Sequence, residues 1–125
     1  MSAQLIIKCA AISGFLAVAL GAFGAHGLKG KLPVDMMNVY QTAVQYQFYH
    51  TMALLAVAIL MLQWGKTMPL TLAAYGFVLG IIVFSGSLYV LSLSGIRWLG
   101  AIAPVGGTAF LVAWLSLFIA AFKVI

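Results

Sequence analysis

The stretch "LGAFGAHGLKGKLP", Leu20 to Pro33, decides between two very different kinds of protein. Its glycines at a spacing of three, with a histidine and two lysines after them, resemble a phosphate-binding loop. A Walker-type loop requires G-x-x-x-x-G-K-[ST], and a dinucleotide-binding turn requires G-x-G-x-x-G after a strand; the stretch fits neither pattern. A long apolar run comes before it, and Gly27, Lys29 and Pro33 follow in the order in which helices commonly end. We interpret the stretch as the exit of a membrane-spanning helix.

The composition of the whole chain indicates that lipid surrounds it. Of its 125 residues, 66% are hydrophobic and 6% are charged, whereas a soluble domain carries roughly 25% charged residues. The formal charge is +5, but the basic residues are scattered singly, and nucleic-acid binding requires a basic patch. We therefore expect no nucleic-acid partner.

The reactive side chains are too few for most catalytic sites. Cys9 is the only cysteine and Asp35 the only side-chain carboxylate, which excludes an intrachain disulfide, cysteine-based metal motifs and mechanisms that use two carboxylates. We expect no catalytic residues, no metal site and no enzymatic activity.

Four apolar runs each reach the roughly 20 residues that a helix needs to cross a membrane. They predict an all-α integral membrane protein, a four-transmembrane-helix bundle with short loops that forms one domain over residues 1–125. We expect the first run to be a membrane span and not a cleaved leader, because Lys8 follows several apolar residues. The predicted spans are 5–25, 39–62, 69–93 and 98–122.

Four spans place both termini on one side of the membrane. The lysines and arginines divide equally, with Lys8, Lys66 and Lys123 on the terminal side against Lys29, Lys31 and Arg97 opposite. The positive-inside rule therefore favours neither orientation of the chain. We place both termini in the cytoplasm, because the free amino terminus adds charge to that side.

Small residues recur along the first and third runs at helical spacings. Because lipid supplies no hydrophobic drive between helices, close approach at small residues is what holds them together. We expect these two spans to pack on each other or across a symmetry axis, and we expect a kink or a short break near Pro104. The predicted packing residues are Gly14, Gly21, Gly76, Gly80 and Ser87.

A polar arc on the second run, "NVYQTAVQYQFYHT" from Asn38 to Thr51, is the most informative segment for function. At about 100° per residue the arc leaves out Tyr40 and Gln47. Polar groups in lipid are costly unless paired, so we expect the arc to face inward, towards serines and a tyrosine of the third span. The candidate polar site comprises Gln41, Gln45, Tyr46, Tyr49, His50, Ser85 and Tyr89.

The two histidines suggest different roles. His50 would lie about 18 Å from the start of its helix, where it would be a neutral hydrogen-bonding core residue, a proton relay or a ligand for haem or a quinone. His26 would lie too near the membrane surface to share one iron with it. We expect His26, Lys29 and Lys31 to contact lipid phosphate.

Four blocks in order together resemble domain-of-unknown-function family 423, also called uncharacterised protein family 0382, whose mitochondrial relatives include transmembrane protein 256. The blocks are "GAFGAHGL" (21–28), "YQFYHT" (46–51), "FSGSLYVLSLSG" (84–95) and "APVGG" (103–107). The resemblance implies a four-span bacterial inner-membrane protein, and it implies no reaction, substrate or cofactor.

Three functions remain open from the sequence. The first is a structural or accessory protein that acts through helix contacts, as a homo-oligomer or as a subunit of a larger membrane complex. The second is a small oligomeric transporter or pore lined by the polar arc. The third is the binding of a lipid, quinone or haem near His50.

Overall fold

The computed structural model describes residues 1–122 and is built entirely from helices within that range. Lys123, which we assigned to the terminal side, lies outside the described residues. The elements in chain order are α1 (Ala3–His26), α2 (Val34–Trp64), α3 (Met68–Gly80), the π-helical turn η1 (Ile81–Ser85), α4 (Gly86–Ser94), the 3₁₀ turn η2 (Arg97–Ala101) and α5 (Ala103–Phe122).

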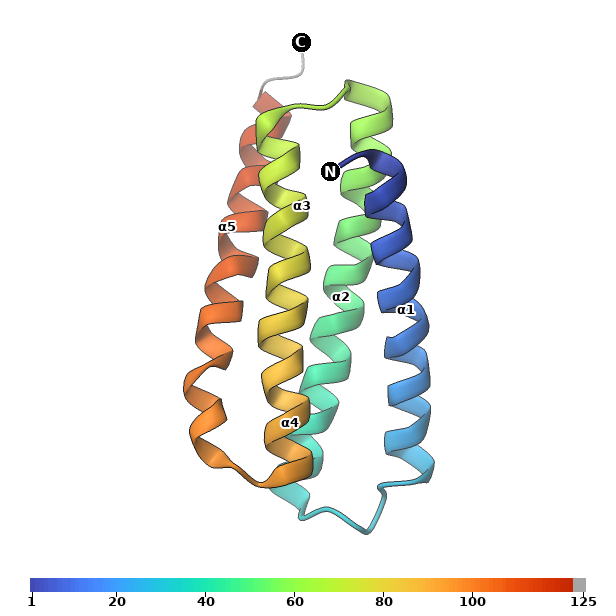
Figure 1. Ribbon diagram of the computed structural model, residues 1–125, viewed down its shortest axis with the longest axis vertical. Helices are drawn as coiled ribbons and strands as arrows, with labels where there is room; N and C mark the ends of the chain where they lie inside the picture. Colours follow the sequence, from blue (N-terminus) through green and yellow to red (C-terminus); the bar gives the residue numbers. More distant parts are fainter. Residues whose placement is uncertain (123–125) are drawn as a thin grey trace.

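Four rods run up and down the long axis of the molecule (Figure 1). They are α1, α2, the continuous α3–η1–α4 rod and the η2–α5 segment, and each is long and apolar enough to cross a membrane. The chain enters α1 and leaves α5 at the same end of the bundle, which also carries the α2–α3 connection. The predicted fold class, a four-helix membrane bundle, is confirmed.

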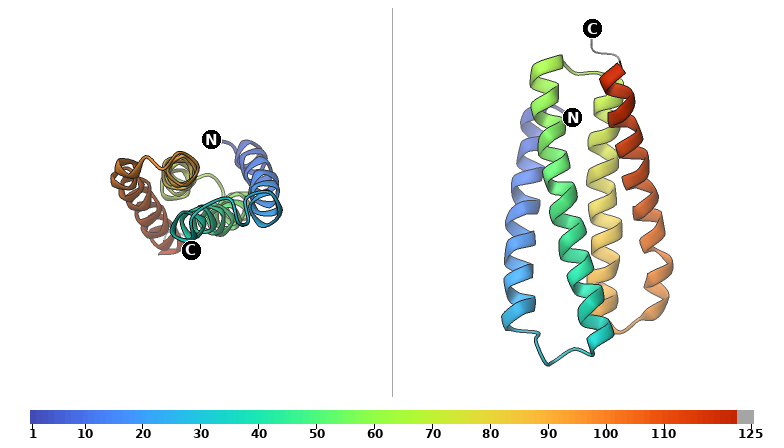
Figure 2. Two further views of the ribbon diagram at one scale, coloured as in Figure 1. Left: turned by 90° about the horizontal axis from the view of Figure 1, so that it is seen from below. Right: turned by 180° about the vertical axis from the view of Figure 1, so that it is seen from behind.

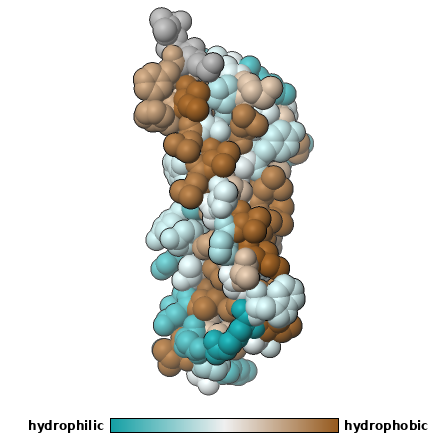
Figure 3. All heavy atoms as spheres, turned by 90° about the vertical axis from the view of Figure 1, so that its left-hand side faces the viewer, coloured by the Kyte–Doolittle hydropathy of each residue, from teal (hydrophilic) through white to brown (hydrophobic). Residues whose placement is uncertain are grey.

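The surface is as apolar as a lipid-facing protein requires. Large hydrophobic side chains are exposed along every rod, for example Phe15 at 71% and Leu111 at 67%. Figure 3 shows hydrophobic residues over most of one side, with hydrophilic residues gathered mainly at the end opposite the termini. An exposed apolar area of this extent is stable only against lipid or another protein.

Two pairs of rods lie side by side along their length, and α2 also packs against the α3–η1–α4 rod and so joins the pairs. Helix α1 lies along α2, and the α3–η1 segment lies along α5 (Figure 2). The expected contact between the first and third spans is therefore wrong within the chain. A β-carbon on Gly21 would lie 3.3 Å from Val44 of α2, and one on Gly80 would meet the ring of Phe110 of α5.

Small residues thus set both pairs, although with partners that we did not predict. Gly14 faces Thr51 of α2, and Gly76 lies so near α5 that a β-carbon would be 2.7 Å from that of Ala113. Ser87, also predicted as a packing residue, is buried and donates to the Phe84 carbonyl of its own rod at 2.9 Å.

Pro104 starts a helix and does not kink one. The η2 turn ends at Ala101 and α5 begins at Ala103, so Pro104 lies in the first helical turn, where a missing N–H leaves no internal bond unmade. Of the expected kink or short break, the structure shows the break, which lies at Ile102 just before the proline. Nearby, Gly106 packs directly on the backbone of Phe84.

Candidate functional site

A hydrogen-bonded network lies in the middle of the bundle, where α1, α2 and α4 meet. Tyr89 donates to Oε1 of Gln47 at 2.6 Å, and Nε2 of Gln47 donates to the Ser13 carbonyl at 2.9 Å. Ser13 and Thr51 join their hydroxyls at 2.6 Å, and Thr51 in turn donates to the Gln47 carbonyl at 2.7 Å. Since the Thr51 proton is used there, the Ser13 hydroxyl is the donor to Thr51. The network ties three rods together.

Tyr40 extends this interior towards the loop end of α1. Its hydroxyl donates to the Leu20 carbonyl, and its ring packs edge-on against Tyr89 with centroids 5.4 Å apart. Ser85 donates to the Ala43 carbonyl at 2.8 Å and binds the π-helical turn to α2. Among residues 1–122, every buried side-chain nitrogen or oxygen has a partner, which is what polar groups in lipid require.

The interior amide is therefore not one that we predicted. Gln47 and Tyr40, which the helical wheel placed off the polar arc, are 4% and 1% exposed. Gln41, Gln45 and Tyr49 lie on the outside of α2 and Tyr46 is 38% exposed, so the expectation that the whole arc faces inward is wrong for these four. The core positions of α2 repeat at alternating spacings of four and three, and this is the signal that would have found Gln47. They are Met36, Tyr40, Ala43, Gln47, His50, Leu54, Val57 and Met61.

His50 is buried one turn further along the same core stripe of α2, among aromatic rings. Its Nδ1–H donates to the Tyr46 carbonyl at 2.7 Å, an arrangement that leaves the lone pair of a neutral ring on Nε2. The ring stacks on Phe110 of α5 with centroids 3.6 Å apart, and Trp114 packs against its edge. This geometry holds the imidazole rigidly near the middle of the bundle.

The candidate polar site is thus divided among three environments. His50 lies with Tyr46 in the aromatic cluster, while Ser85 and Tyr89 bond to the interior side of α2. Gln41, Gln45 and Tyr49 are exposed. No three histidine, cysteine or carboxylate side chains come together among residues 1–122. A haem or quinone at His50 was an open alternative from the sequence and not a predicted cofactor, and it stays open.

Gln41 and Gln45 form an outward-facing site of their own. Side-chain hydrogen bonds of this part of α2 are made by Tyr40, Thr42 and Gln47, and none by either of these amides within residues 1–122. A shallow groove of about 390 Å³ runs beside them, and its α1 wall consists of Gly21, Gly24 and Ala25. We call Gln41, Gln45 and Phe48, which share one exposed stripe of α2, the amide face.

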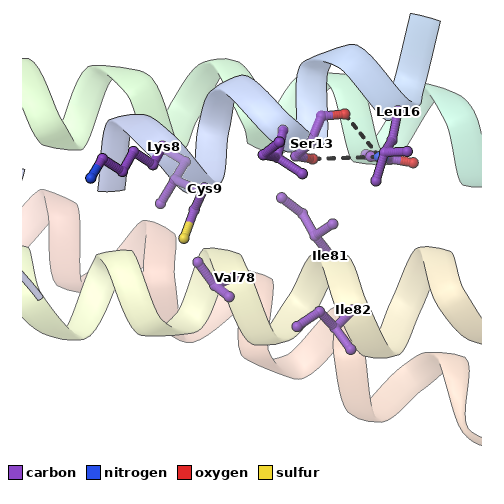
Figure 4. A pocket seen from close by; sticks show the side chains of 10 residues that line it. Lys8, Cys9, Ser13, Leu16, Val78, Ile81 and Ile82 are labelled. Atoms are coloured by element: carbon purple, nitrogen blue, oxygen red, sulfur yellow. Dashed lines mark hydrogen bonds between the residues drawn. The ribbon is translucent and has the colours of Figure 1, made fainter. Parts of the chain in front are cut away.

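A second groove lies on the other side of the α1–α2 pair, where α1 faces α3 and η1 (Figure 4). Its volume is about 390 Å³, and Gln47 and Leu54 of α2 form its floor. Apart from Lys8 at one end, its lining is almost entirely apolar, and the Gln47 amide is already bonded to Ser13 and Tyr89.

The polar end of the bundle, opposite the termini, carries the predicted phosphate contacts. His26, Lys29 and Lys31 are exposed there. Asp35 accepts a 3.1 Å hydrogen bond from Arg97, and both side chains are more than half exposed. Contact of the first three residues with lipid phosphate stays a prediction.

Comparison with known proteins identifies relatives along nearly the whole chain. Residues 20–107 match a family model described as a protein of unknown function, DUF423. The UPF0382 membrane protein YwdK of Bacillus subtilis is 46% identical over 96% of this chain and 98% of its own length. The UPF0382 inner membrane protein YgdD of Escherichia coli is 40% identical over 98% and 93% of the two chains. No solved structure matches.

Proposed function

The chain belongs to the DUF423 family of membrane proteins, and from that premise we propose that it is an accessory membrane protein whose activity is contact between helices, through the amide face of α2. The observation that carries the proposal is the pair of unpartnered amides beside a glycine-walled groove. The occupant that fits this face best is a second copy of the chain.

The depth of Gln45 makes an uncovered amide costly. Gln45 lies about 6 Å along the helix from the centre of the 31-residue α2, counted at 1.5 Å per residue, whereas the hydrocarbon core extends about 15 Å on each side of its midplane. Burying an amide in an apolar medium without a hydrogen-bond partner costs several kcal/mol of free energy. A partner that both donates and accepts removes this cost.

A second copy supplies such a partner by symmetry. An amide carries both a donor and an acceptor, so the amide face can pair with itself across a two-fold axis. Gly21, Gly24 and Ala25 lack bulk, which allows a neighbouring helix to approach closely beside the amides. Polar pairing and close approach together are the usual basis of helix association in lipid.

The test is the mass of the protein extracted from its own membrane in mild detergent. We expect a dimer. In the double variant Gln41→Leu, Gln45→Leu, we expect the free energy of dimer dissociation to fall by about 1 to 4 kcal/mol, the contribution of two interhelical hydrogen bonds. Gln4→Leu, at an exposed amide in the first turn of α1, is the matched control and should stay dimeric. A wild-type monomer without a copurifying protein, or a double variant as dimeric as the wild type, would contradict the proposal.

We further propose that the protein resides in a bacterial inner membrane with both termini in the cytoplasm. The E. coli relative is named an inner membrane protein, and the described chain begins and ends at one end of the bundle. A fluorescent protein fused to the C-terminus should fluoresce, and alkaline phosphatase fused there should be inactive. The reverse pattern would invert the proposed orientation.

A further inference from the structure

We infer that the groove between α1 and the α3–η1 segment holds an acyl chain of an anionic phospholipid, whose headgroup binds Lys8. This ligand goes beyond the helix contact proposed above and uses the opposite side of the α1–α2 pair. The evidence is the lining of the groove, its extent along the membrane normal and its charge.

The lining suits a hydrocarbon chain. Aliphatic side chains of η1 and α3 face the α1 wall across the gap, and the polar floor is satisfied by its own hydrogen bonds (Figure 4). Branched aliphatic side chains on both walls leave a channel instead of the flat glycine surface that a second helix would require. The facing residues are Cys9, Ile12 and Leu16 on one wall and Val78, Ile81 and Ile82 on the other.

The groove covers one leaflet. The middle of α1 falls between Gly14 and Phe15, so Lys8 lies about 10 Å from it and Leu16 about 2 Å beyond it, at 1.5 Å per residue. A leaflet of the hydrocarbon core is about 15 Å thick. The groove therefore extends from near the membrane surface to the midplane, as an acyl chain of the terminal-side leaflet does.

The positive charge of Lys8 has no side-chain carboxylate of the chain beside it. Among residues 1–122, Lys8 is the only charged residue that lines the groove, and its side chain runs along α1 towards the N-terminal end (Figure 4). A lysine at this depth extends its ammonium to the headgroup level. Asp35, the only side-chain carboxylate, is bound to Arg97 at the other end of the bundle. A lipid phosphate is the anion available at the position of Lys8.

The test is photo-crosslinking in phosphatidylcholine vesicles that contain a small fraction of lipid with a diazirine on its acyl chain. The labelled lipid is phosphatidylglycerol in one sample and phosphatidylcholine in the other, and mass spectrometry maps the crosslinked peptides. Exposed Leu111 on α5 provides an internal reference for ordinary lipid contact. We expect the crosslinking yield of groove peptides to exceed that of the reference peptide. We also expect the groove yield to be about fivefold higher with phosphatidylglycerol than with phosphatidylcholine, which is the effect of one lysine near a membrane surface.

Three variants separate the parts of the inference. Lys8→Gln should abolish the preference for phosphatidylglycerol, whereas Lys66→Gln, an exposed lysine of the α2–α3 connection at the same end, should keep it. Ile82→Trp, at a groove position that is 62% exposed, should reduce groove crosslinks for both lipids and leave those on α5 unchanged. Equal labelling of groove and α5 would overturn the acyl-chain site. A preference unaffected by Lys8→Gln, or absent from the wild type, would overturn the headgroup contact.

Discussion

Gly106 in the first turns of α5 offers the sharpest test of the packing between the third and fourth rods. A β-carbon at this position would meet the backbone of Phe84, with the Phe84 α-carbon only 2.7 Å away. Real β-carbons essentially never lie this close to backbone atoms, and a backbone cannot rotate away as a side chain does. Gly106→Ala must therefore push α5 away from η1.

The neighbouring glycine supplies the control. At Gly107 a β-carbon would lie 3.9 Å from the Phe84 ring, an ordinary contact. Alanine in place of glycine stabilises a helix by up to about 1 kcal/mol, and overpacking costs about 1–3 kcal/mol. We therefore expect Gly106→Ala to lower the free energy of unfolding by about 1–2 kcal/mol and Gly107→Ala to leave it unchanged or raise it slightly.

The assay is reversible unfolding in mixed micelles of a mild and a denaturing detergent, followed by circular dichroism. The quantity compared is the difference between the two variants, which removes any effect common to both. If Gly106→Ala is as stable as Gly107→Ala, α5 does not lie against Phe84 as described.

Two further predictions concern polar contacts. Gln47→Leu should lower the free energy of unfolding by about 1–3 kcal/mol, because it removes the buried amide and leaves the half-buried Tyr89 hydroxyl without its acceptor. Gln63→Leu, at an exposed amide near the end of α2, should change it little in the same detergent titration; equal effects would contradict the interior network. Arg97→Gln should lower the free energy of unfolding by less than about 1 kcal/mol, and by less still at high salt, because the ion pair of Arg97 with Asp35 is exposed. If thermal unfolding shows that Arg97→Gln lowers the free energy of unfolding by more than about 2 kcal/mol, the ion pair is not the weak surface contact described here.

The sequence predicted the fold class because composition alone decided it. A chain with 6% charged residues cannot cover a water-facing surface, and backbone groups in lipid leave helices as the simple solution. The partners of the helices could not be predicted in the same way. Gly21 and Gly80 indicated close packing, but a glycine does not indicate which helix packs against it. The residues that contact them, Val44 and Phe110, are not distinguished by any pattern in the sequence.

The same limit applies to the prediction of individual site residues. The wheel grouped Gln41 and Gln45 with His50 because it counted polar residues, whereas burial follows the alternating spacing that joins Tyr40, Gln47 and His50. An amide in the middle of a membrane helix has two ways to be satisfied, inside the chain or against a neighbour. Only coordinates distinguish the two.

The π-helical turn η1 also lay beyond prediction. Neither glycine nor proline lies within Ile81–Ser85, although Gly80 and Gly86 flank it. The turn inserts an extra residue into the ladder of the third rod, and it places Ser85 against Ala43 while Ile81 and Ile82 line the groove. Residues before and after this turn therefore do not continue one helical face.

The outward, self-paired amide face is the central claim, and cysteine crosslinking in native membranes tests it most directly. In a Cys9→Ser background, Phe48→Cys introduces a thiol one turn from Gln45 on that face, and Leu111→Cys introduces one on exposed α5. We expect oxidation or a short bifunctional reagent to join the Phe48→Cys protein into dimers and to leave the Leu111→Cys protein monomeric. Equal crosslinking at the two positions, or none at Phe48→Cys, would contradict it.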